Sequence, residues 1–453
     1  MILAIDAKIL AGIVQGELKT TANPGFTEVV TDSRQLKPGC LFVALQGPRF
    51  DGHDYVAEAR VKGASLALVS DWVDDPLPQV KVESTLLALG QLAAWNRQAF
   101  KQPLIGVTGN SGKTSVKELL VACLAESWGS VAATRGNLNN NIGLPLTLLE
   151  LQATDQAAVV EMGANHLGEI AYLAGLAQPD VAIITNVTGA HLGEFGSLEA
   201  IAKAKGELLE QLDAEKVAIL NAEDRFYTYW QGLVKGNALS FGLHQGDIHA
   251  QQLHLDSSGN SSFVAVTPWG QQAFQLQLPG LHNVANALAV IAAAGYLGLS
   301  LARLAEVMQK QQPVVGRMQR VKGYADCLIF DDSYNASPGA VKSAIDLLAR
   351  LPGERLLVLG ALAELGAASE QVHLELGAYA RQQGLDGCYV LAGDAAVAAQ
   401  GFGQGAEVLP DLASLAACLK QRLTAESCVL VKGSRSAGMD RLVDLLRVGS
   451  TVV

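Results

Sequence analysis

A glycine-rich segment followed by lysine and threonine carries the clearest chemistry in this sequence. Glycines let backbone N–H groups curl around phosphate oxygens, and a helix that begins at the lysine adds its positive dipole end. Lys113 can reach terminal phosphates, and the Thr114 hydroxyl can bind Mg²⁺. The segment therefore predicts a nucleoside triphosphate site of the phosphate-binding-loop type. Its residues are Thr108, Gly109, Asn110, Ser111, Gly112, Lys113 and Thr114.

The flanks of this segment fit the same interpretation. An apolar stretch from Leu104 to Val107 precedes it, and apolar residues from Val116 to Leu124 recur at helical spacing after it. Val107 stands where the strict spacing of the motif has glycine, so Gly106 and Gly109 bracket the turn instead. An ordinary turn between a strand and a helix is the alternative.

Two further polar residues follow apolar, β-branched stretches downstream. Glu161 ends the run that starts at Ala157, and His191 comes shortly after Val181–Val187. Parallel sheets gather functional groups at the carboxyl ends of their strands, and a carboxylate beside a triphosphate is suited to a second Mg²⁺. A solvated loop glutamate and a structural histidine are the alternatives.

Lys205 lies on an unusual face of an expected helix that opens at Ser197. At 100° per residue it falls inside the apolar stripe of that helix, whereas Lys203 points to the other side. A buried lysine loses its proton easily and becomes available for unusual chemistry. A lysine that extends along the stripe to reach water is the alternative.

The carboxyl-terminal third holds another polar cluster. Asp331 and Asp332 end an apolar stretch, and Arg317 and Arg320 lie just past a break at Gln311–Pro313. These groups could close over a nucleotide held by the preceding domain. Two aspartates in a turn that caps a helix are the alternative.

The chain of 453 residues is too long for one core and predicts three α/β domains. Strands and helices alternate after a polar stretch at residues 97–103, and a second doubly wound unit follows the break near 313. We expect a small N-terminal α/β domain at residues 1–98. A central phosphate-binding-loop domain with a parallel sheet is expected at 99–313, and a Rossmann-like domain at 314–453.

Composition narrows the function classes. A net charge of −11 argues against general nucleic-acid binding, and 49% hydrophobic residues describe well-buried domains. The six cysteines are scattered without metal-site spacing, which is typical of a reducing compartment. An acidic N-terminus and glycine-interrupted apolar runs argue against export and against a membrane span. We therefore expect a cytoplasmic protein.

Taken together, these segments resemble the Mur ligases, the ATP-dependent amide-forming enzymes of peptidoglycan precursor synthesis. The order and spacing of the matching segments carry the resemblance across nearly the whole chain. They are Thr31–Arg34, Asp51–His53, Thr108–Thr114, Gly136–Pro145, Glu161–Asn165, Ala190–Leu192, Ala202–Glu207, His282–Ala287, Asp331–Ala336 and Val431–Ser436.

The resemblance implies roles for the matching positions. Residues 108–114 would hold the phosphates of ATP. The implied Mg²⁺ ligands are Thr114, Glu161, His191 and Lys205, the last as a carbamate. The other implied contacts are Asn283 and Asn286 on the adenine side, Arg317 and Asp332 on phosphate and ribose, Ser33 and Arg34 near the uridine diphosphate, and Asn137, Asn140 and Asn141 near the muramoyl-peptide.

The matching pattern is that of the members that join D-alanyl-D-alanine to a UDP-N-acetylmuramoyl-tripeptide through an acyl phosphate. The ligase that adds the third residue lacks support because its D-N-P-R motif is absent, and folylpolyglutamate synthase fits the N-terminal segments less well. Two departures concern the acceptor side: Ala361 replaces an aspartate, and Ser337 replaces an asparagine.

Classes outside this superfamily remain alternatives. A regulatory ATPase would have no need of a buried Lys205, and a non-catalytic scaffold would not need the full set of phosphate and metal ligands. For the ligase, we expect a monomer whose C-terminal domain rotates onto the central one, about a hinge at residues 312–316, when ATP and the muramoyl substrate bind.

Overall fold

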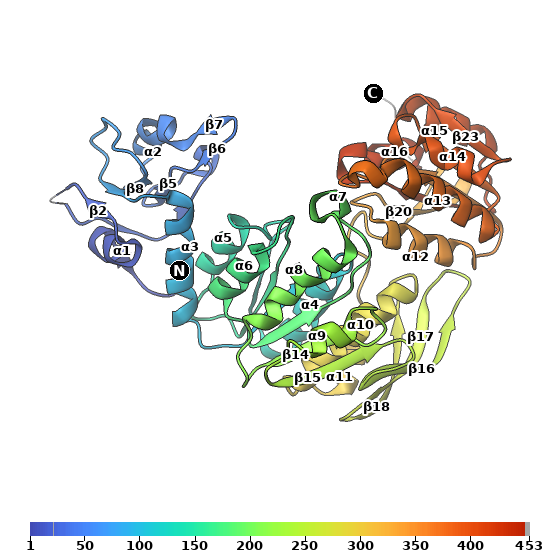
Figure 1. The fold of residues 1–453 in the computed structure, drawn as a ribbon, viewed down its shortest axis with the longest axis horizontal. Helices are drawn as coiled ribbons and strands as arrows, with labels where there is room; N and C mark the ends of the chain where they lie inside the picture. Colours follow the sequence, from blue (N-terminus) through green and yellow to red (C-terminus); the bar gives the residue numbers. More distant parts are fainter. Residues whose placement is uncertain (21, 449–453) are drawn as a thin grey trace.

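The computed structural model describes residues 1–20 and 22–448 of the chain. Three α/β domains follow one another along its longest axis, as Figure 1 shows. The N-terminal domain lies at one end, the central domain occupies the middle, and the C-terminal domain sits at the other end. The predicted three-domain α/β architecture is confirmed.

The N-terminal domain is built on a five-stranded sheet in the order β2-β9-β8-β5-β4. Four of its strands run parallel, and β2 pairs antiparallel with β9 at one edge. Its elements are α1 (Ala7–Val14), β2 (Glu17–Leu18), β4 (Val29–Val30), β5 (Leu41–Val43), α2 (Val56–Val61), β8 (Leu66–Val69), β9 (Gln79–Lys81) and α3 (Thr85–Ala99).

Helix α3 joins this domain to the next one. The 97–103 stretch, expected as a polar linker, begins inside α3, because the Arg97 side chain is buried and donates to backbone carbonyls of Ala177 (2.7 Å) and Gln178 (2.9 Å). Asn96, also buried, donates to the carbonyl of Leu148 at 2.8 Å. One hydrophobic core continues from the N-terminal sheet into the central domain. The polar residues of this stretch therefore fasten two domains together.

The central domain has a nine-stranded sheet in the order β11-β12-β10-β13-β14-β15-β16-β17-β18. Helices α4 and α10 pack on one face, and α5, α6 and α8 on the other. Its strands are β10 (Leu104–Thr108), β11 (Val131–Ala133), β12 (Ala157–Glu161), β13 (Val181–Ile184), β14 (Val217–Asn221), β15 (Asn237–Gly242), β16 (Ile248–Leu255), β17 (Ser261–Thr267) and β18 (Gly270–Leu276). Its helices are α4 (Lys113–Trp128), α5 (Gly143–Leu149), α6 (Glu169–Ala177), α7 (Leu192–Phe195), α8 (Leu198–Glu210), α9 (Tyr227–Gln231), α10 (Leu281–Tyr296) and α11 (Leu301–Met308).

The antiparallel end of this sheet departs from the expected all-parallel domain. Strands β16, β17 and β18 pair antiparallel, and buried and partly exposed residues alternate along β17. Such alternation suits a sheet with only one face on the core, and consecutive antiparallel strands need only short turns between them.

The C-terminal domain is doubly wound, as predicted. Its sheet has the order β19-β20-β24-β21-β22-β23, with only β19 antiparallel, and separate hydrophobic cores cover the two faces. Its strands are β19 (Gln319–Lys322), β20 (Leu328–Asp332), β21 (Glu354–Leu359), β22 (Gly387–Leu391), β23 (Ala406–Leu409) and β24 (Ser427–Lys432). Its helices are α12 (Pro338–Leu348), α13 (Ser369–Gln382), α14 (Val397–Phe402), α15 (Leu412–Arg422) and α16 (Met439–Leu446).

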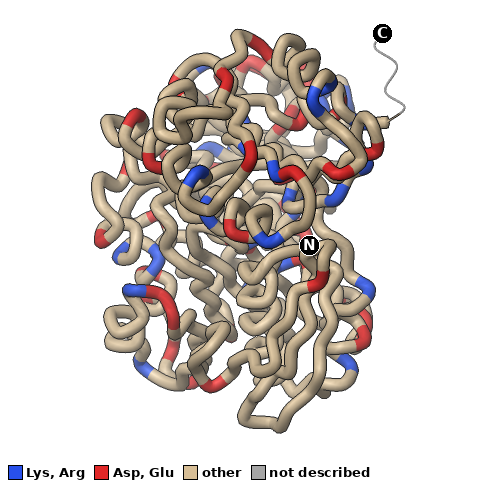
Figure 2. The backbone as a smooth tube through the Cα atoms, turned by 90° about the vertical axis from the view of Figure 1, so that its right-hand side faces the viewer, with Lys and Arg blue, Asp and Glu red and all other residues tan. Residues whose placement is uncertain are grey.

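Charged residues of both signs are interspersed along the backbone in the view of Figure 2. Within the described part of the chain, none of the helices combines the length and the apolar character that crossing a bilayer requires.

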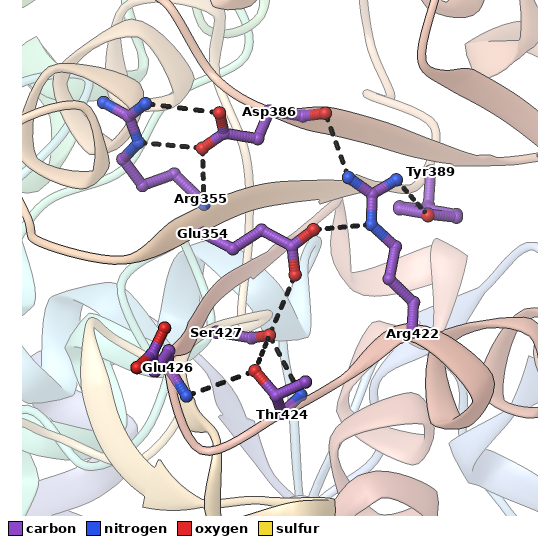
Figure 3. A network of polar contacts seen from close by, with 8 residues as sticks. All are labelled: Glu354, Arg355, Asp386, Tyr389, Arg422, Thr424, Glu426 and Ser427. Carbon is purple, nitrogen blue, oxygen red and sulfur yellow. Dashed lines mark hydrogen bonds and ion pairs between the residues drawn. The ribbon is translucent and has the colours of Figure 1, made fainter.

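A polar network closes the amino-terminal end of the C-terminal sheet, opposite the strand ends that carry Asp332 and Lys432 (Figure 3). Arg422 lies at its centre. The guanidinium donates to the Glu354 carboxylate at 2.7 Å, to the Tyr389 hydroxyl at 2.7 Å and to the Asp386 carbonyl at 3.1 Å. Ser427 donates to the other oxygen of Glu354 at 2.9 Å, so β21, β22 and β24 are tied to the end of α15.

We expect Arg422→Ala to destabilise the C-terminal domain by about 1 kcal/mol, because the partly buried Glu354 carboxylate and the buried Tyr389 hydroxyl lose a charged hydrogen-bond partner. Denaturant unfolding followed by circular dichroism measures this change. Arg441→Ala is the control, because Arg441 is exposed on the same domain. Equal unfolding midpoints for the two variants would show that the network contributes nothing.

Candidate active site

The phosphate-binding loop joins the end of β10 to the start of α4, as predicted. Gly109 (φ 139°) and Gly112 (φ 84°) adopt backbone conformations that favour glycine. A Cβ on Gly109 would stand 2.0 Å from the Thr185 hydroxyl oxygen, and one on Gly112 would stand 2.4 Å from Asn286 Oδ1. Both glycines are therefore required for the loop to lie against its neighbours.

Residues of the adjacent strand end hold this loop. Asn186 accepts from the Ser111 amide at 3.0 Å through its side chain and from the Asn110 amide at 2.9 Å through its carbonyl. Thr108 is fully buried, and its hydroxyl donates to the Met162 carbonyl at 2.9 Å. This bond ties the start of the loop to the residue that follows β12.

The Lys113 ammonium lies within the loop itself. Its Nζ donates to the Gly109 carbonyl at 2.8 Å and to the Asn110 carbonyl at 3.3 Å. Burial lowers the pKa of Lys113, and the nearby Glu161 carboxylate opposes that shift. The loop thus presents a partly desolvated cation next to backbone N–H groups.

Thr114 and Glu161 meet beside the loop. The Thr114 hydroxyl donates to Glu161 Oε2 at 2.8 Å, and both residues are buried. Asn139 donates to Glu161 Oε1 at 2.9 Å. Hydroxyl and carboxylate oxygens are the ligands that Mg²⁺ prefers, so the chemistry of this pair fits that ion.

The C-terminal domain reaches this pair directly. Arg317 donates from Nη2 to the Thr114 hydroxyl oxygen at 3.0 Å, and its guanidinium lies 4.3 Å from the centroid of the Tyr334 ring. Ser337 lies 3.2 Å from the Ser111 hydroxyl and 3.3 Å from that of Thr188, oxygen to oxygen. Residues from both sides of the 311–313 break therefore meet at the phosphate-binding loop.

His191 faces the same cavity from the loop before α7. Its backbone is left-handed, with φ 63°, and its Nδ1 forms an ion pair with the Glu364 carboxylate of the C-terminal domain. The contact with His191 lowers the pKa of Glu364, against the opposing effect of burial.

Lys205 is buried in α8 with only 1% of its surface exposed, and Lys203 is exposed, as the helical periodicity predicts. The pKa of Lys205 is lowered to about 7, because burial disfavours the ammonium form and Lys113 adds repulsion. Its Nζ lies 5.8 Å from the centroid of the Phe195 ring. The Lys205 side chain is therefore partly a neutral amine near pH 7.

These groups surround a cavity of about 910 Å³ between the three domains. Asn283 and Asn286 line it from α10 and are joined by a 3.1 Å hydrogen bond. Asp332 lines it from the end of β20, where Lys432 donates to its carboxylate at 2.5 Å. Leu86 and Leu87, from α3, border the same cavity.

Most of the predicted site residues border this cavity. They are Asn110, Ser111, Gly112, Lys113, Thr114, Asn137, Asn140, Asn141, Glu161, His191, Lys205, Asn283, Asn286, Arg317 and Asp332. Thr108 and Gly109, at the start of the loop, do not border the cavity. Ser33 and Arg34 lie apart in the N-terminal domain, where Arg34 forms a bidentate ion pair with Asp32 at 2.7–3.2 Å.

Asn139, Glu364 and Lys432 are among the residues at the site that were not predicted. Asn139 belongs to a run of asparagines, and the pattern does not distinguish it from Asn140, whose side chain caps the turn into α5 at 2.9 Å. Lys432 and Glu364 lie in segments that the family resemblance covers, but their partners come from distant parts of the chain.

Comparisons with known proteins agree along the whole chain. The Mur ligase middle domain matches residues 107–294, the Mur ligase glutamate ligase domain matches 316–435, and the Mur ligase family catalytic domain matches 26–97. The chain is 40% identical to the UDP-N-acetylmuramoyl-tripeptide–D-alanyl-D-alanine ligase of Escherichia coli (strain K12), over 99% of this chain and 100% of that protein. The corresponding ligase of Synechocystis sp. is 39% identical over 92% of this chain and 91% of its own.

Solved structures share the fold. A crystal structure of MurF from Acinetobacter baumannii superposes with a TM-score of 0.91 and 35% identity, over 97% of this chain and 98% of that one. The structure of MurF ligase from Thermotoga maritima in complex with ADP gives a TM-score of 0.84 and 31% identity, over 92% and 96% of the two chains. Full-length sequence matches, a shared three-domain fold and a phosphate-binding loop facing an interdomain cavity lead to one conclusion: this chain belongs to the Mur ligase family.

Proposed function

We propose that this chain joins D-alanyl-D-alanine to UDP-N-acetylmuramoyl-tripeptide with the consumption of ATP, in peptidoglycan precursor synthesis. The observation that carries this function is the full-length 40% identity to a ligase of that activity, combined with a phosphate-binding loop that the C-terminal domain contacts through Arg317. The substrates belong to the cytoplasm, where we place the reaction. We further propose that the enzyme acts as a monomer.

The three domains divide the substrates in this proposal. Residues 1–98, with Ser33 and Arg34, bind the UDP-muramoyl portion; residues 99–313 bind ATP; and residues 314–453 bind the amino substrate. Asn137, Asn140 and Asn141 border the cavity just before α5, which packs against α3 of the N-terminal domain, and this supports their contact with the muramoyl-peptide. Asn283, Asn286 and Asp332 border it on the side of α10 and β20, which supports their place around the nucleoside.

The chemistry is acyl transfer in two steps. The terminal carboxylate of the tripeptide attacks the γ-phosphorus of ATP, giving an acyl phosphate and ADP. The amine of D-alanyl-D-alanine then attacks the acyl carbon, and the tetrahedral intermediate releases inorganic phosphate to leave an amide. Backbone N–H groups of the loop, Lys113 and Arg317 surround the phosphates, so they offset negative charge as two anions approach.

Mg²⁺ would supply further charge neutralisation at the phosphates when bound. We propose that Thr114 would bind one ion beside the loop and that Glu161 and His191 would bind the second, with Lys205 as a further metal ligand in its carbamate form. Within residues 1–20 and 22–448, no three His, Cys, Asp or Glu side chains converge on one point. Few protein ligands are typical of Mg²⁺, which keeps waters and binds substrate phosphates.

We propose that Lys205 carries a carbamate. Its burial and its pKa of about 7 support this, since a neutral amine reacts with CO₂ to give a carbamate and a proton. The carbamate adds an anionic oxygen ligand where the chain otherwise places a cation close to Lys113.

Phosphate release tests the reaction type. We expect release to require ATP, UDP-N-acetylmuramoyl-tripeptide and D-alanyl-D-alanine together, with one amide formed per phosphate. Lys113→Ala should lower this rate by ~10²-fold or more, because charge at the phosphates is no longer offset. Lys101→Ala is the control, since Lys101 is exposed before the loop. Steady phosphate release without any amine would instead identify a regulatory ATPase.

Lys205→Ala should reduce amide synthesis by ~10²-fold, and added bicarbonate should not restore it, because no amine remains to form a carbamate. Lys203→Ala, exposed on the opposite face of α8, should retain activity. In the wild-type enzyme the neutral form of Lys205 gains population as pH rises through its pKa of about 7, so activation by bicarbonate should be greater at pH 8 than at pH 6. Full activity of Lys205→Ala would reject the carbamate.

A further inference from the structure

The turn that carries His191 contacts one residue of the C-terminal domain, Glu364, at two points. The Glu364 carboxylate forms an ion pair with His191 Nδ1, and the Glu364 carbonyl accepts from the Gly193 amide at 2.7 Å. Side chain and backbone of the same residue therefore hold two points of the 191–193 turn. His191 and Glu364 come from different domains, on either side of the 311–313 break.

The backbone on both sides is shaped for this contact. His191 and Glu364 each have φ 63°, a left-handed conformation that is uncommon for residues other than glycine and that surrounding contacts must maintain. A Cβ on Gly193 would stand 2.7 Å from the Gly366 amide nitrogen and 2.9 Å from the Glu364 carbonyl oxygen. The two turns can approach this closely only because Gly193 lacks a side chain.

The contact determines which ring nitrogen of His191 is available. A carboxylate on Nδ1 keeps a proton on that nitrogen, so the lone pair of the neutral ring is left on Nε2. His191 also borders the cavity that Glu161 and Lys205 border. A carboxylate behind a histidine in this way orients the ring and makes it a better metal ligand.

We propose that Glu364 is the positioning residue of His191: by contacting Nδ1 from the C-terminal domain, it fixes the ring for metal binding and links that binding to the seating of the domain. This inference rests on the proposed function, because it assumes that His191 binds a divalent cation beside ATP. In this role Glu364 acts through His191. Its consequence is that metal affinity depends on a side chain of the C-terminal domain.

The test measures Mn²⁺ affinity by electron paramagnetic resonance, in the presence of a non-hydrolysable ATP analogue. Glu364→Ala should weaken Mn²⁺ binding by about 10-fold, within the range for lost partners of metal-binding histidines, and Glu364→Gln should weaken it less. His191→Ala should weaken it at least as much, and the double variant should bind like His191→Ala alone. Glu370→Ala, exposed nearby on α13, is the matched control and should bind like the wild type.

A second readout does not need the metal. Nitrogen-15 spectra of histidine-labelled protein should show His191 protonated at Nδ1 in the wild type and in Glu370→Ala, and mainly at Nε2 in Glu364→Ala. If Glu364→Ala fails to fold, Glu364→Gln provides the same comparison. Normal Mn²⁺ affinity in the Glu364 variants, or independent effects that multiply in the double variant, would overturn the proposal.

Amide synthesis by the wild type separates this inference from the proposed function. An active ligase whose Glu364 variants bind Mn²⁺ normally would reject the role of Glu364 alone. A wild type that shows the Mn²⁺ coupling but makes no amide would reject the ligase activity alone. Unchanged Mn²⁺ affinity in His191→Ala would overturn both the metal role of His191 and that of Glu364.

Discussion

The hydrogen bond from Arg317 to Thr114 is the contact on which the site depends. Thr114 is the first helical threonine after the phosphate-binding loop and already contacts Glu161, so Arg317 places a C-terminal cation where loop, helix and carboxylate meet. Thr114 and Glu161 are buried and Arg317 is partly buried, so charge interactions among them are stronger than in bulk water. The contact therefore joins two separately folded sheets into one electrostatic site.

The rest of the interface supports this contact with close backbone approaches. Gly339, in the first turn of α12, donates from its amide to the Thr188 carbonyl at 3.2 Å, and a Cβ there would stand 2.5 Å from that of Thr188. The N-terminal domain is attached differently, through the buried Arg97 and Asn96 of α3 and a shared hydrophobic core. One junction is thus fixed by burial of side chains, while the other is a polar surface that substrates can also contact.

Much of this site could be predicted because the sequence patterns that place its residues lie within a single helix or strand. The apolar periodicity of α8 was enough to predict that Lys205 is buried and Lys203 exposed, and the strand-end position of Glu161 predicted its meeting with the loop. Glu364 and Lys432 could not be found in this way, since their functions arise from contacts between domains. Arg97 was assigned to a linker because its polarity is visible in the sequence, whereas the carbonyls that bind it are not. The antiparallel β16–β18 extension was missed for a similar reason: its alternation is short and its pairing is tertiary.

Solution scattering of the wild type and Arg317→Ala tests the central claim that this contact assembles the site. Each protein is measured with an ATP analogue and UDP-N-acetylmuramoyl-tripeptide. The wild type should adopt a compact arrangement in which the C-terminal domain is seated on the phosphate-binding loop. Arg317→Ala should keep a larger radius of gyration under the same conditions, because the cation at Thr114 is missing. Equal radii for the two liganded proteins would contradict the account.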